Sequence, residues 1–240
     1  LWLIFAAFGL SVAFGKTGLG HRIAYYLVRA FGSTTLRLGY VTAFLDLILS
    51  PATPSNTARA AGIVYPINLS IAEAVGSYPG ESAKKAGAYL LQNGYFATKV
   101  TSFLFATAMA PNLLALDFIT KLTGVSLNWG QWAAAMFVPG FIMLMLVPII
   151  GYMYERPTVK EIDNKKIAED GLAELGPMKV SEKGLIAIAL LAITGWILPT
   201  FGIKIDATAV AIVAMIATFV CGIITWDDLL KTKAAWNTLI

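Results

Sequence analysis

The chain is poor in charge, in histidine and in cysteine. Charged residues make up 13% of its 240 residues, about half of their share in soluble domains. One histidine, His21, and one cysteine, Cys221, leave no internal disulfide and no His/Cys metal cluster. Because Cys221 lies in an apolar run, we expect it to be a packing residue.

Other missing features narrow the range of functions further. No nucleophile stands beside a base, and Gly15-Lys16-Thr17 lacks the glycine-rich approach of a phosphate-binding loop. The net charge of +4 is not gathered in a basic stripe with interleaved aromatic residues, so no nucleic-acid partner is expected. The sequence therefore argues against an enzyme and predicts no catalytic residue, no metal site and no organic cofactor.

Apolar residues, by contrast, make up 58% of the chain. A soluble core of this size cannot hide so much apolar surface, because surface area grows quickly with chain length. A lipid bilayer can accept it. The charges are also clustered, since thirteen of them lie between Glu155 and Lys183. The composition predicts an all-α integral membrane protein interrupted by one polar loop.

Spanning helices need about 20 mostly apolar residues. Three later stretches meet this length, and they are Trp132–Tyr154, Leu185–Phe201 and Ala207–Trp226. The last two are joined by a short turn, which predicts an antiparallel hairpin of spanning helices.

The N-terminal region and the polar loop have a different character. Leu1–Gly15 is apolar but shorter than a full span, as expected of a span that the chain enters part-way. Lys16–Gly32 mixes basic and apolar residues, which is typical of an amphipathic helix at the membrane interface, with His21 as an interfacial side chain. Glu155–Lys183 mixes charges of both signs, and we expect a solvated, partly helical linker on the cytoplasmic side.

Two polar interruptions of apolar sequence are the strongest sign of function. Irregular backbone in a bilayer leaves polar groups unsatisfied unless it lines a cavity or is buried in protein. Paired interruptions of this kind predict a substrate site near the bilayer midplane. The first interruption is 50–57, and it lies between the apolar segments Leu36–Leu49 and Ala58–Val75. The second interruption is 107–112, and it lies between Tyr89–Ala106 and Leu113–Ile119.

The first interruption has the chemistry of an anion site. Ser55, Asn56 and Thr57 are residue types that cap helix N-termini, where free N–H groups and the helix dipole favour a carboxylate. We expect Pro54 to shape the turn before them. The same residues start ordinary helices, and only their place between two half-spans favours a binding role. In the second interruption, a proline kink relieved by Thr107 is the alternative.

Asp46 lies in an apolar half-span, where an ionisable side chain is a candidate for function. It equally fits a structural ion pair with Arg37 or Arg59. Arg59 in turn fits either attraction of an anion to the hairpin or a structural salt bridge. The residues alone do not decide between these roles.

The string Pro51–Ile67 resembles the divalent anion:sodium symporter family, whose hallmark is Ser-Asn-Thr followed by Pro-Ile about ten residues later. The Ala58-Arg59 extension resembles its exchanger branch, which includes bacterial citrate, tartrate and succinate antiporters and the plastid 2-oxoglutarate/malate translocator. The resemblance covers this chain but only about half of a family member. No second Ser-Asn-Thr occurs here, so we expect the other half of the site to lie outside these 240 residues.

The resemblance implies an inverted-repeat transporter with a re-entrant hairpin, a homodimer and an elevator motion. The membrane would be a bacterial cytoplasmic membrane or an organelle inner envelope. A transport domain would comprise 33–154, a cytoplasmic linker 155–183, and a scaffold 1–32 and 184–240. The candidate substrate-binding residues are Ser55, Asn56, Thr57, Thr53, Ala108, Pro111 and Asn112.

Two departures from the family concern sodium. Pro51 stands where sodium-coupled members often have a serine, and Ala108 stands where they have a glycine. We therefore expect sodium-independent exchange of di- or tricarboxylates, and a sodium-coupled symporter is the main competing hypothesis. A channel, a membrane-embedded enzyme and a non-transporting scaffold subunit also compete with it, although the polar interruptions argue against the scaffold subunit.

Overall fold

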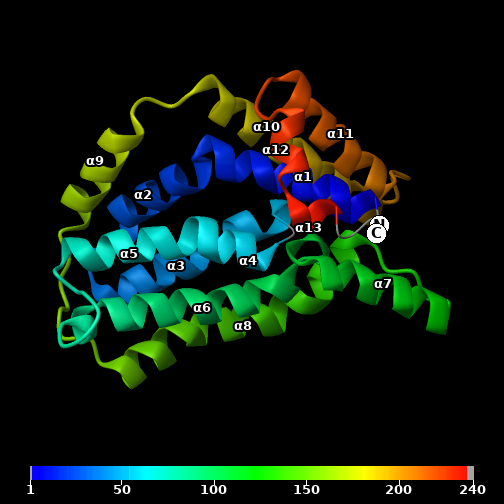
Figure 1. Cartoon of the computed structure of the whole chain (residues 1–240). Helices are drawn as coiled ribbons and strands as arrows, with labels where there is room; N and C mark the ends of the chain where they lie inside the picture. The colour runs from blue at the N-terminus through cyan, green and yellow to red at the C-terminus, as the bar shows by residue number, and fades with distance from the viewer. Residues whose placement is uncertain (1, 54, 237–240) are drawn as a thin grey trace.

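The computed structural model describes residues 2–53 and 55–236. Among these residues the secondary structure is helical, and no strand is formed. Pro54, expected to shape the hairpin turn, lies outside them. The predicted all-α fold is confirmed (Figure 1).

The α-helices are α1 (Trp2–Thr17), α2 (Leu19–Phe31), α3 (Thr35–Leu49), α4 (Asn56–Arg59), α5 (Tyr65–Ala74), α6 (Gly87–Leu104), α7 (Ala110–Thr123), α8 (Trp129–Glu155), α9 (Asn164–Leu175), α10 (Val180–Ile197), α11 (Ala207–Val220), α12 (Trp226–Leu230) and α13 (Lys233–Trp236). Shorter turns are the 3₁₀ segments Ser50–Ala52, Ala83–Lys85, Ala106–Ala108 and Leu198–Phe201, and the π-helical segment Ala60–Val64.

In the described part of the chain, two helices are long and apolar enough to cross a membrane, namely α8 and the continuous stretch Val180–Phe201 that contains α10. They confirm two of the predicted spans. The bent pair α1–α2 would make a third if it is one span. The predicted stretch Ala207–Trp226 is wrong at its end, because α11 stops at Val220. Gly222, at φ 64°, takes the left-handed conformation that ends helices, and Cys221 is exposed rather than packed.

One group of helices consists of α3, α5, α6 and α8, which lie side by side (Figure 1). Buried amides fix their spacing. The Asn68 amide donates to the Leu90 carbonyl at 2.8 Å and accepts from the Thr42 hydroxyl at 3.0 Å. The Asn93 amide donates to the Gly39 carbonyl at 2.9 Å. These bonds join α3, α5 and α6 within an apolar interior, where unpaired polar groups would be costly.

A second group consists of α1, α10 and α11. Small residues let these helices approach closely, since a Cβ on Gly195 would lie 2.9 Å from the Val210 side chain. At the end of α1, the Lys16 ammonium donates to the Asp228 carboxylate at 2.5 Å and ties α12 to this group. That bond, together with bonds from Thr225, holds the pKa of Asp228 well below its ordinary value.

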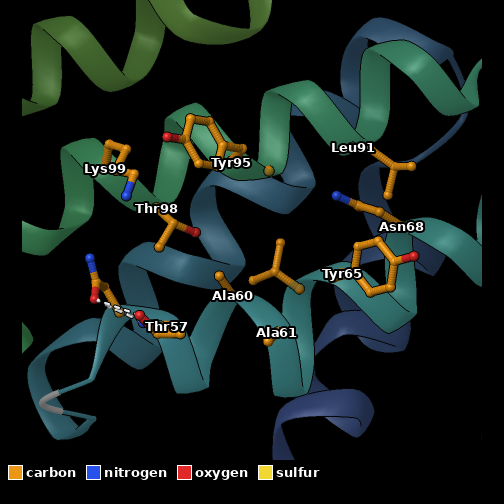
Figure 2. A pocket seen from close by; sticks show the side chains of 12 residues that line it. Thr57, Ala60, Ala61, Tyr65, Asn68, Leu91, Tyr95, Thr98 and Lys99 are labelled. Carbon is orange, nitrogen blue, oxygen red and sulfur yellow. Dashed lines mark hydrogen bonds between the residues drawn. The ribbon is translucent and has the colours of Figure 1, made fainter.

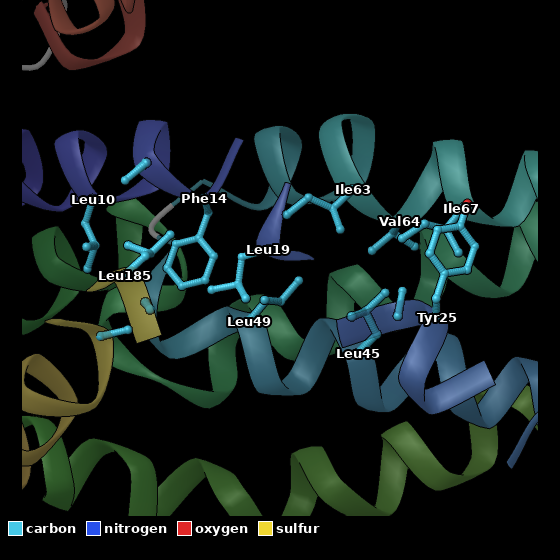
Figure 3. Packing of buried hydrophobic residues seen from close by; sticks show 14 of the residues in the cluster. Leu10, Phe14, Leu19, Tyr25, Leu45, Leu49, Ile63, Val64, Ile67 and Leu185 are labelled. Atoms are coloured by element: carbon cyan, nitrogen blue, oxygen red, sulfur yellow. The ribbon is translucent and has the colours of Figure 1, made fainter. Parts of the chain in front are cut away.

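One apolar cluster contains residues of both groups (Figure 3). Residues of α1 and α2 pack there against α3, the helix that follows the hairpin tip, and α10. Within a bilayer, where lipid tails are as apolar as these side chains, close van der Waals packing stabilises such a core. The labelled members are Leu10, Phe14, Leu19, Tyr25, Leu45, Leu49, Ile63, Val64, Ile67 and Leu185.

The predicted amphipathic helix is α2, and it leaves α1 at an angle of 62°. The change of direction occurs at Gly18, whose φ of 76° suits glycine. Its buried face carries Arg22, whose Nε lies 2.5 Å from Oε2 of Glu182. Both side chains are almost fully buried, so this ion pair fixes α2 to the start of α10.

The linker is less solvated than expected. Its backbone bonds to residues before the hairpin, with the Thr35 N–H donating to the Lys160 carbonyl at 3.0 Å and the Ile162 N–H to the Ser33 carbonyl at 3.1 Å. Helix α9 then packs on α2, and its Ala168 is fully buried. The sequence prediction missed this small apolar face, because the charged residues around it made the linker look fully polar.

Candidate functional site

The first interruption forms the tip of a helical hairpin. Helix α3 ends in the 3₁₀ turn Ser50–Ala52, and Thr53 is extended. Ser55 caps the next helix, because its Oγ accepts from the Ala58 N–H at 3.2 Å. The helix then runs through α4, the π-helical segment and α5 as far as Ala74. The N-capping role expected for this tripeptide is therefore confirmed for Ser55.

The second interruption begins earlier than the sequence suggested. Helix α6 ends at Leu104, the 3₁₀ turn Ala106–Ala108 follows, and Met109 is extended. Pro111 lies in the first turn of α7, where a missing N–H costs nothing. Asn112 is also in that turn, and its amide donates to the carbonyls of Ser102 and Phe105. Proline here starts a helix rather than breaking one, which explains why the interruption also ends earlier than predicted, with α7 beginning at Ala110.

The two interruptions are in contact. The Thr107 hydroxyl donates to the Pro51 carbonyl at 2.5 Å and accepts from the Trp129 indole N–H at 2.9 Å. The Trp129 ring stacks on Phe105 and on Trp196 of α10. Irregular backbone from two distant segments is thus satisfied by protein groups, the condition under which such backbone persists in a bilayer.

A buried ion pair joins the interruptions. Asp46 pairs with Arg59 rather than Arg37: the Arg59 Nε lies 2.8 Å from Asp46 Oδ1, and both side chains are fully buried. The same guanidinium donates to the carbonyls of Thr53 at 2.8 Å and Ala108 at 3.2 Å. Each carbonyl belongs to a different interruption, so Arg59 fastens the hairpin tip to the broken helix.

Thr101 completes this network, although no sequence pattern singled it out. Its hydroxyl donates to the second carboxylate oxygen of Asp46 and lies 3.3 Å from an Arg59 guanidinium nitrogen. A threonine in an apolar helix is too common to single out. Only the position of Thr101, near the end of α6, brings it to the ion pair.

A groove of about 380 Å³ lies between the hairpin and α6. Its walls are mostly apolar or small, and its polar side chains come from both elements (Figure 2). Such a concave, mainly apolar site with a few placed polar groups suits a small molecule. The lining residues with polar side chains are Asn56, Thr57, Tyr65, Asn68, Tyr95, Thr98 and Lys99.

The predicted site residues divide into two sets. Asn56 and Thr57 line the groove, with Ser55 beside them as the cap. The other four do not line it. Thr53, Ala108 and Asn112 are buried, with polar atoms already bonded within the chain, and Pro111 is exposed on α7.

Five polar residues of the groove were not predicted from the sequence, and they are Tyr65, Asn68, Tyr95, Thr98 and Lys99. Lys99 is the charged one among them. Its signal was available, because it is the single charged residue in the apolar stretch that forms α6. No cluster of three His, Cys, Asp or Glu residues that could hold a metal ion occurs within 2–53 and 55–236.

Comparison with known proteins gives a consistent picture. A family model described as "Sodium:sulfate symporter transmembrane region" matches residues 1–240. The chain is 53% identical over 239 residues to the inner membrane protein YbhI of Escherichia coli, and 40% identical over 239 residues to the L-tartrate/succinate antiporter of that organism. It is 54% identical over 239 residues to a transporter of Haemophilus influenzae. These matches cover 99–100% of the chain but 49–50% of each relative, so the chain spans about half their length.

Proposed function

Because this chain belongs to the divalent anion:sodium symporter family and is a multi-pass integral membrane protein, we propose that the full-length protein exchanges di- or tricarboxylates across the membrane without sodium. The observation that carries the proposal is the groove beside the hairpin tip. Asn56 and Thr57 place an amide and a hydroxyl there, at the start of a helix. Neutral donors of this kind hold a carboxylate and still release it, as a transporter must.

The substrate class draws on one relative. The Escherichia coli protein that is 40% identical to this chain is named for L-tartrate and succinate, both four-carbon dicarboxylates. The groove has room for a molecule of that size. We propose succinate, malate, 2-oxoglutarate, citrate or tartrate as the substrate class of the full-length protein.

Arg59 supports sodium independence. A sodium ion in such a protein would bind carbonyl oxygens exposed at broken helices. Here the guanidinium of Arg59 donates to one such carbonyl in each interruption, those of Thr53 and Ala108. A fixed positive charge therefore already lies where these carbonyls converge. With Pro51 and Ala108 replacing the serine and glycine expected of sodium-coupled members, the chain is poorly suited to bind sodium at this point.

The packing fits a two-part transporter. We propose that α3 to α8 belong to a transport domain, and that α1, α10 and α11 belong to a scaffold through which a homodimer forms. Motion of the first part along the second would carry the groove across the membrane. In support, the hairpin, α6 and α8 pack closely with one another, while α1 packs mainly on α11.

Counterflow tests the proposed function. The full-length protein is reconstituted in liposomes loaded with unlabelled succinate, malate or 2-oxoglutarate, and uptake of labelled succinate is followed with and without sodium. We expect that uptake requires internal dicarboxylate and that its rate is the same with and without sodium. Uptake into empty liposomes driven by a sodium gradient would make the protein a symporter. The absence of carboxylate uptake under every condition would refute the function itself.

A further inference from the structure

Three aromatic rings form a stack that runs from the broken helix to α10. The ring centroids of Phe105 and Trp129 lie 5.4 Å apart with 13° between the ring planes, and those of Trp129 and Trp196 lie 6.4 Å apart with 20° between the planes. Phe105 follows the last residue of α6, Trp129 is the first residue of α8, and Trp196 lies in α10. The stack therefore crosses the boundary between the proposed transport domain and the proposed scaffold.

On the transport side, Trp129 is tied to the hairpin tip. Its indole N–H donates to the Thr107 hydroxyl at 2.9 Å, and that hydroxyl donates to the Pro51 carbonyl at 2.5 Å. All three residues are buried, and a hydrogen bond in a low-dielectric interior is stronger than one in water. A displacement of the Trp129 ring would therefore reach the turn that precedes Asn56 and Thr57.

On the scaffold side, the ring of Trp196 is held in place. Trp196 is 1% exposed, and its indole N–H donates to the carbonyl of Ala207, the first residue of α11, at 3.1 Å. Helix α10 also contacts the turn Ser50–Ala52 of the hairpin tip. The surface on which Trp129 stacks is thus fixed to α11 and does not belong to the hairpin.

Beside the stack, the first turn of α8 lies against the turn Leu198–Phe201 that follows α10. A Cβ on Gly130 would overlap the Thr200 hydroxyl and would lie 3.1 Å from the Thr200 Cβ. The Asn128 side chain, which caps α8, lies 3.4 Å from the same hydroxyl. So close an approach depends on the missing side chain of Gly130, and it fits one relative position of the two elements.

We propose that Trp129 is a positioning residue that couples the hairpin-tip site to the docking of the transport domain on the scaffold. This inference rests on the proposed function and concerns the regulation of that same site. While Trp129 stacks on Trp196, Thr107 holds the Pro51 carbonyl and fixes the turn before Asn56. When the transport domain moves along the scaffold, the stack separates, because Trp196 stays with α11. Docking and carboxylate binding are then coupled in free energy.

A disulfide across the contact tests whether it separates. The full-length protein, with Cys221 and any other native cysteine replaced by serine, carries Gly130→Cys and Thr200→Cys, whose Cβ atoms would lie near the 3.5–4.5 Å that a disulfide requires. We expect oxidation to stop succinate counterflow in liposomes and reduction to restore it, so the reduced protein is the matched control. An oxidised protein that exchanges succinate as fast as the reduced one would overturn the proposal. Failure of the pair to cross-link would overturn it as well.

Two tryptophan variants test the coupling, and they decide if the cysteine pair is inactive when reduced. Trp129→Phe keeps a ring on Trp196 but loses the N–H that binds Thr107, and Trp196→Leu removes the stack from outside the groove. In each we expect the affinity for succinate to fall by about twofold to tenfold, the effect of one neutral hydrogen bond or one aromatic pair. Trp196→Phe should restore much of the affinity. Trp226→Leu, which removes an exposed tryptophan of α12, should leave it unchanged.

A purely structural role for the stack predicts lower unfolding temperatures with wild-type affinity for succinate. That result in both Trp129→Phe and Trp196→Leu would overturn the proposal. A wild-type protein without carboxylate counterflow would instead refute the proposed function. An active wild type whose oxidised cysteine variant still exchanges succinate would refute the coupling alone.

Discussion

The guanidinium of Arg59 lies 2.8 Å from the carboxylate of Asp46, across the hairpin, with neither side chain exposed. The pair is the point at which the two arms of the hairpin and the broken helix are joined, because Arg59 also donates to the Thr53 and Ala108 carbonyls. Removal of one partner leaves a buried charge without compensation, whereas removal of both does not.

The first prediction concerns this pair. We expect Arg59→Leu to destabilise the folded state by about 3–5 kcal/mol, measured as a lower unfolding midpoint in detergent. The double variant Asp46→Leu/Arg59→Leu should recover part of this loss. Arg37→Leu is the matched control, because the Arg37 side chain is exposed and, among the described residues, donates a hydrogen bond only to the Ser33 hydroxyl. This variant should change the midpoint little. A single Arg59 variant as stable as wild type would show that the pair does not hold the hairpin.

The second prediction compares two ion pairs of helix α2. Arg22 and Glu182 are 4% and 2% exposed, whereas Arg29 and Glu169 are 53% and 59% exposed and 3.5 Å apart. We expect Arg22→Met to cost about 3–5 kcal/mol and Arg29→Met about 0–1 kcal/mol. Thermal unfolding at low and high salt checks both. Equal effects would mean that α2 is not fastened to α10 through Arg22.

The third prediction concerns the close approach of α6 to the hairpin. A Cβ on Gly94 would lie 2.7 Å from the Asn68 amide nitrogen and 3.0 Å from Val64. Gly94→Ala should therefore destabilise by about 1–3 kcal/mol and weaken substrate binding by widening the groove. On the same hairpin, a Cβ on Gly62 meets nothing within 4 Å, so Gly62→Ala should be neutral or slightly stabilising. Equal changes in stability and in substrate binding for Gly94→Ala and Gly62→Ala would contradict the prediction.

The fourth prediction concerns Asn56. Its side chain is partly exposed and lines the groove, so Asn56→Ala should weaken carboxylate binding by about tenfold or more with little change in unfolding temperature. Asn164→Ala removes an amide from the linker, where it bonds to the Val28 and Arg29 carbonyls, and should leave the affinity unchanged. Competition with labelled succinate uptake measures both. Normal affinity in Asn56→Ala would remove this residue from the site.

The sequence predicted the helices well where apolar length alone decides them, as in α8 and α10. It also located both interruptions, because polar residues and prolines are conspicuous between half-spans. It could not choose between Arg37 and Arg59 as the partner of Asp46, since the choice depends on how the hairpin folds back. Partners brought together only by the tertiary fold, such as Thr101 and Lys99 from α6, were missed for the same reason.

The candidate site was predicted only in part. Asn56 and Thr57 begin the helix that follows the hairpin tip, and both line the groove. Thr53 and Asn112 looked equally suitable as polar residues at a break, but the backbone of each break needs partners of its own. Their side chains supply those partners, and this demand cannot be read from residue type.

The bend at Gly18 gives α2 the mechanics of a lever. Gly18, in the left-handed conformation, is the single residue between α1 and α2, so no loop separates the two helices. The lever arm is about 20 Å long, from 13 residues at 1.5 Å each. If α1 tilted by about 10° together with α10, to which Arg22 ties α2, the far end of α2 would swing by about 3–4 Å, and such a tilt lies within the range seen for membrane helices. That end leads directly into α3, so a small tilt at the N-terminus would be delivered to the hairpin as a displacement.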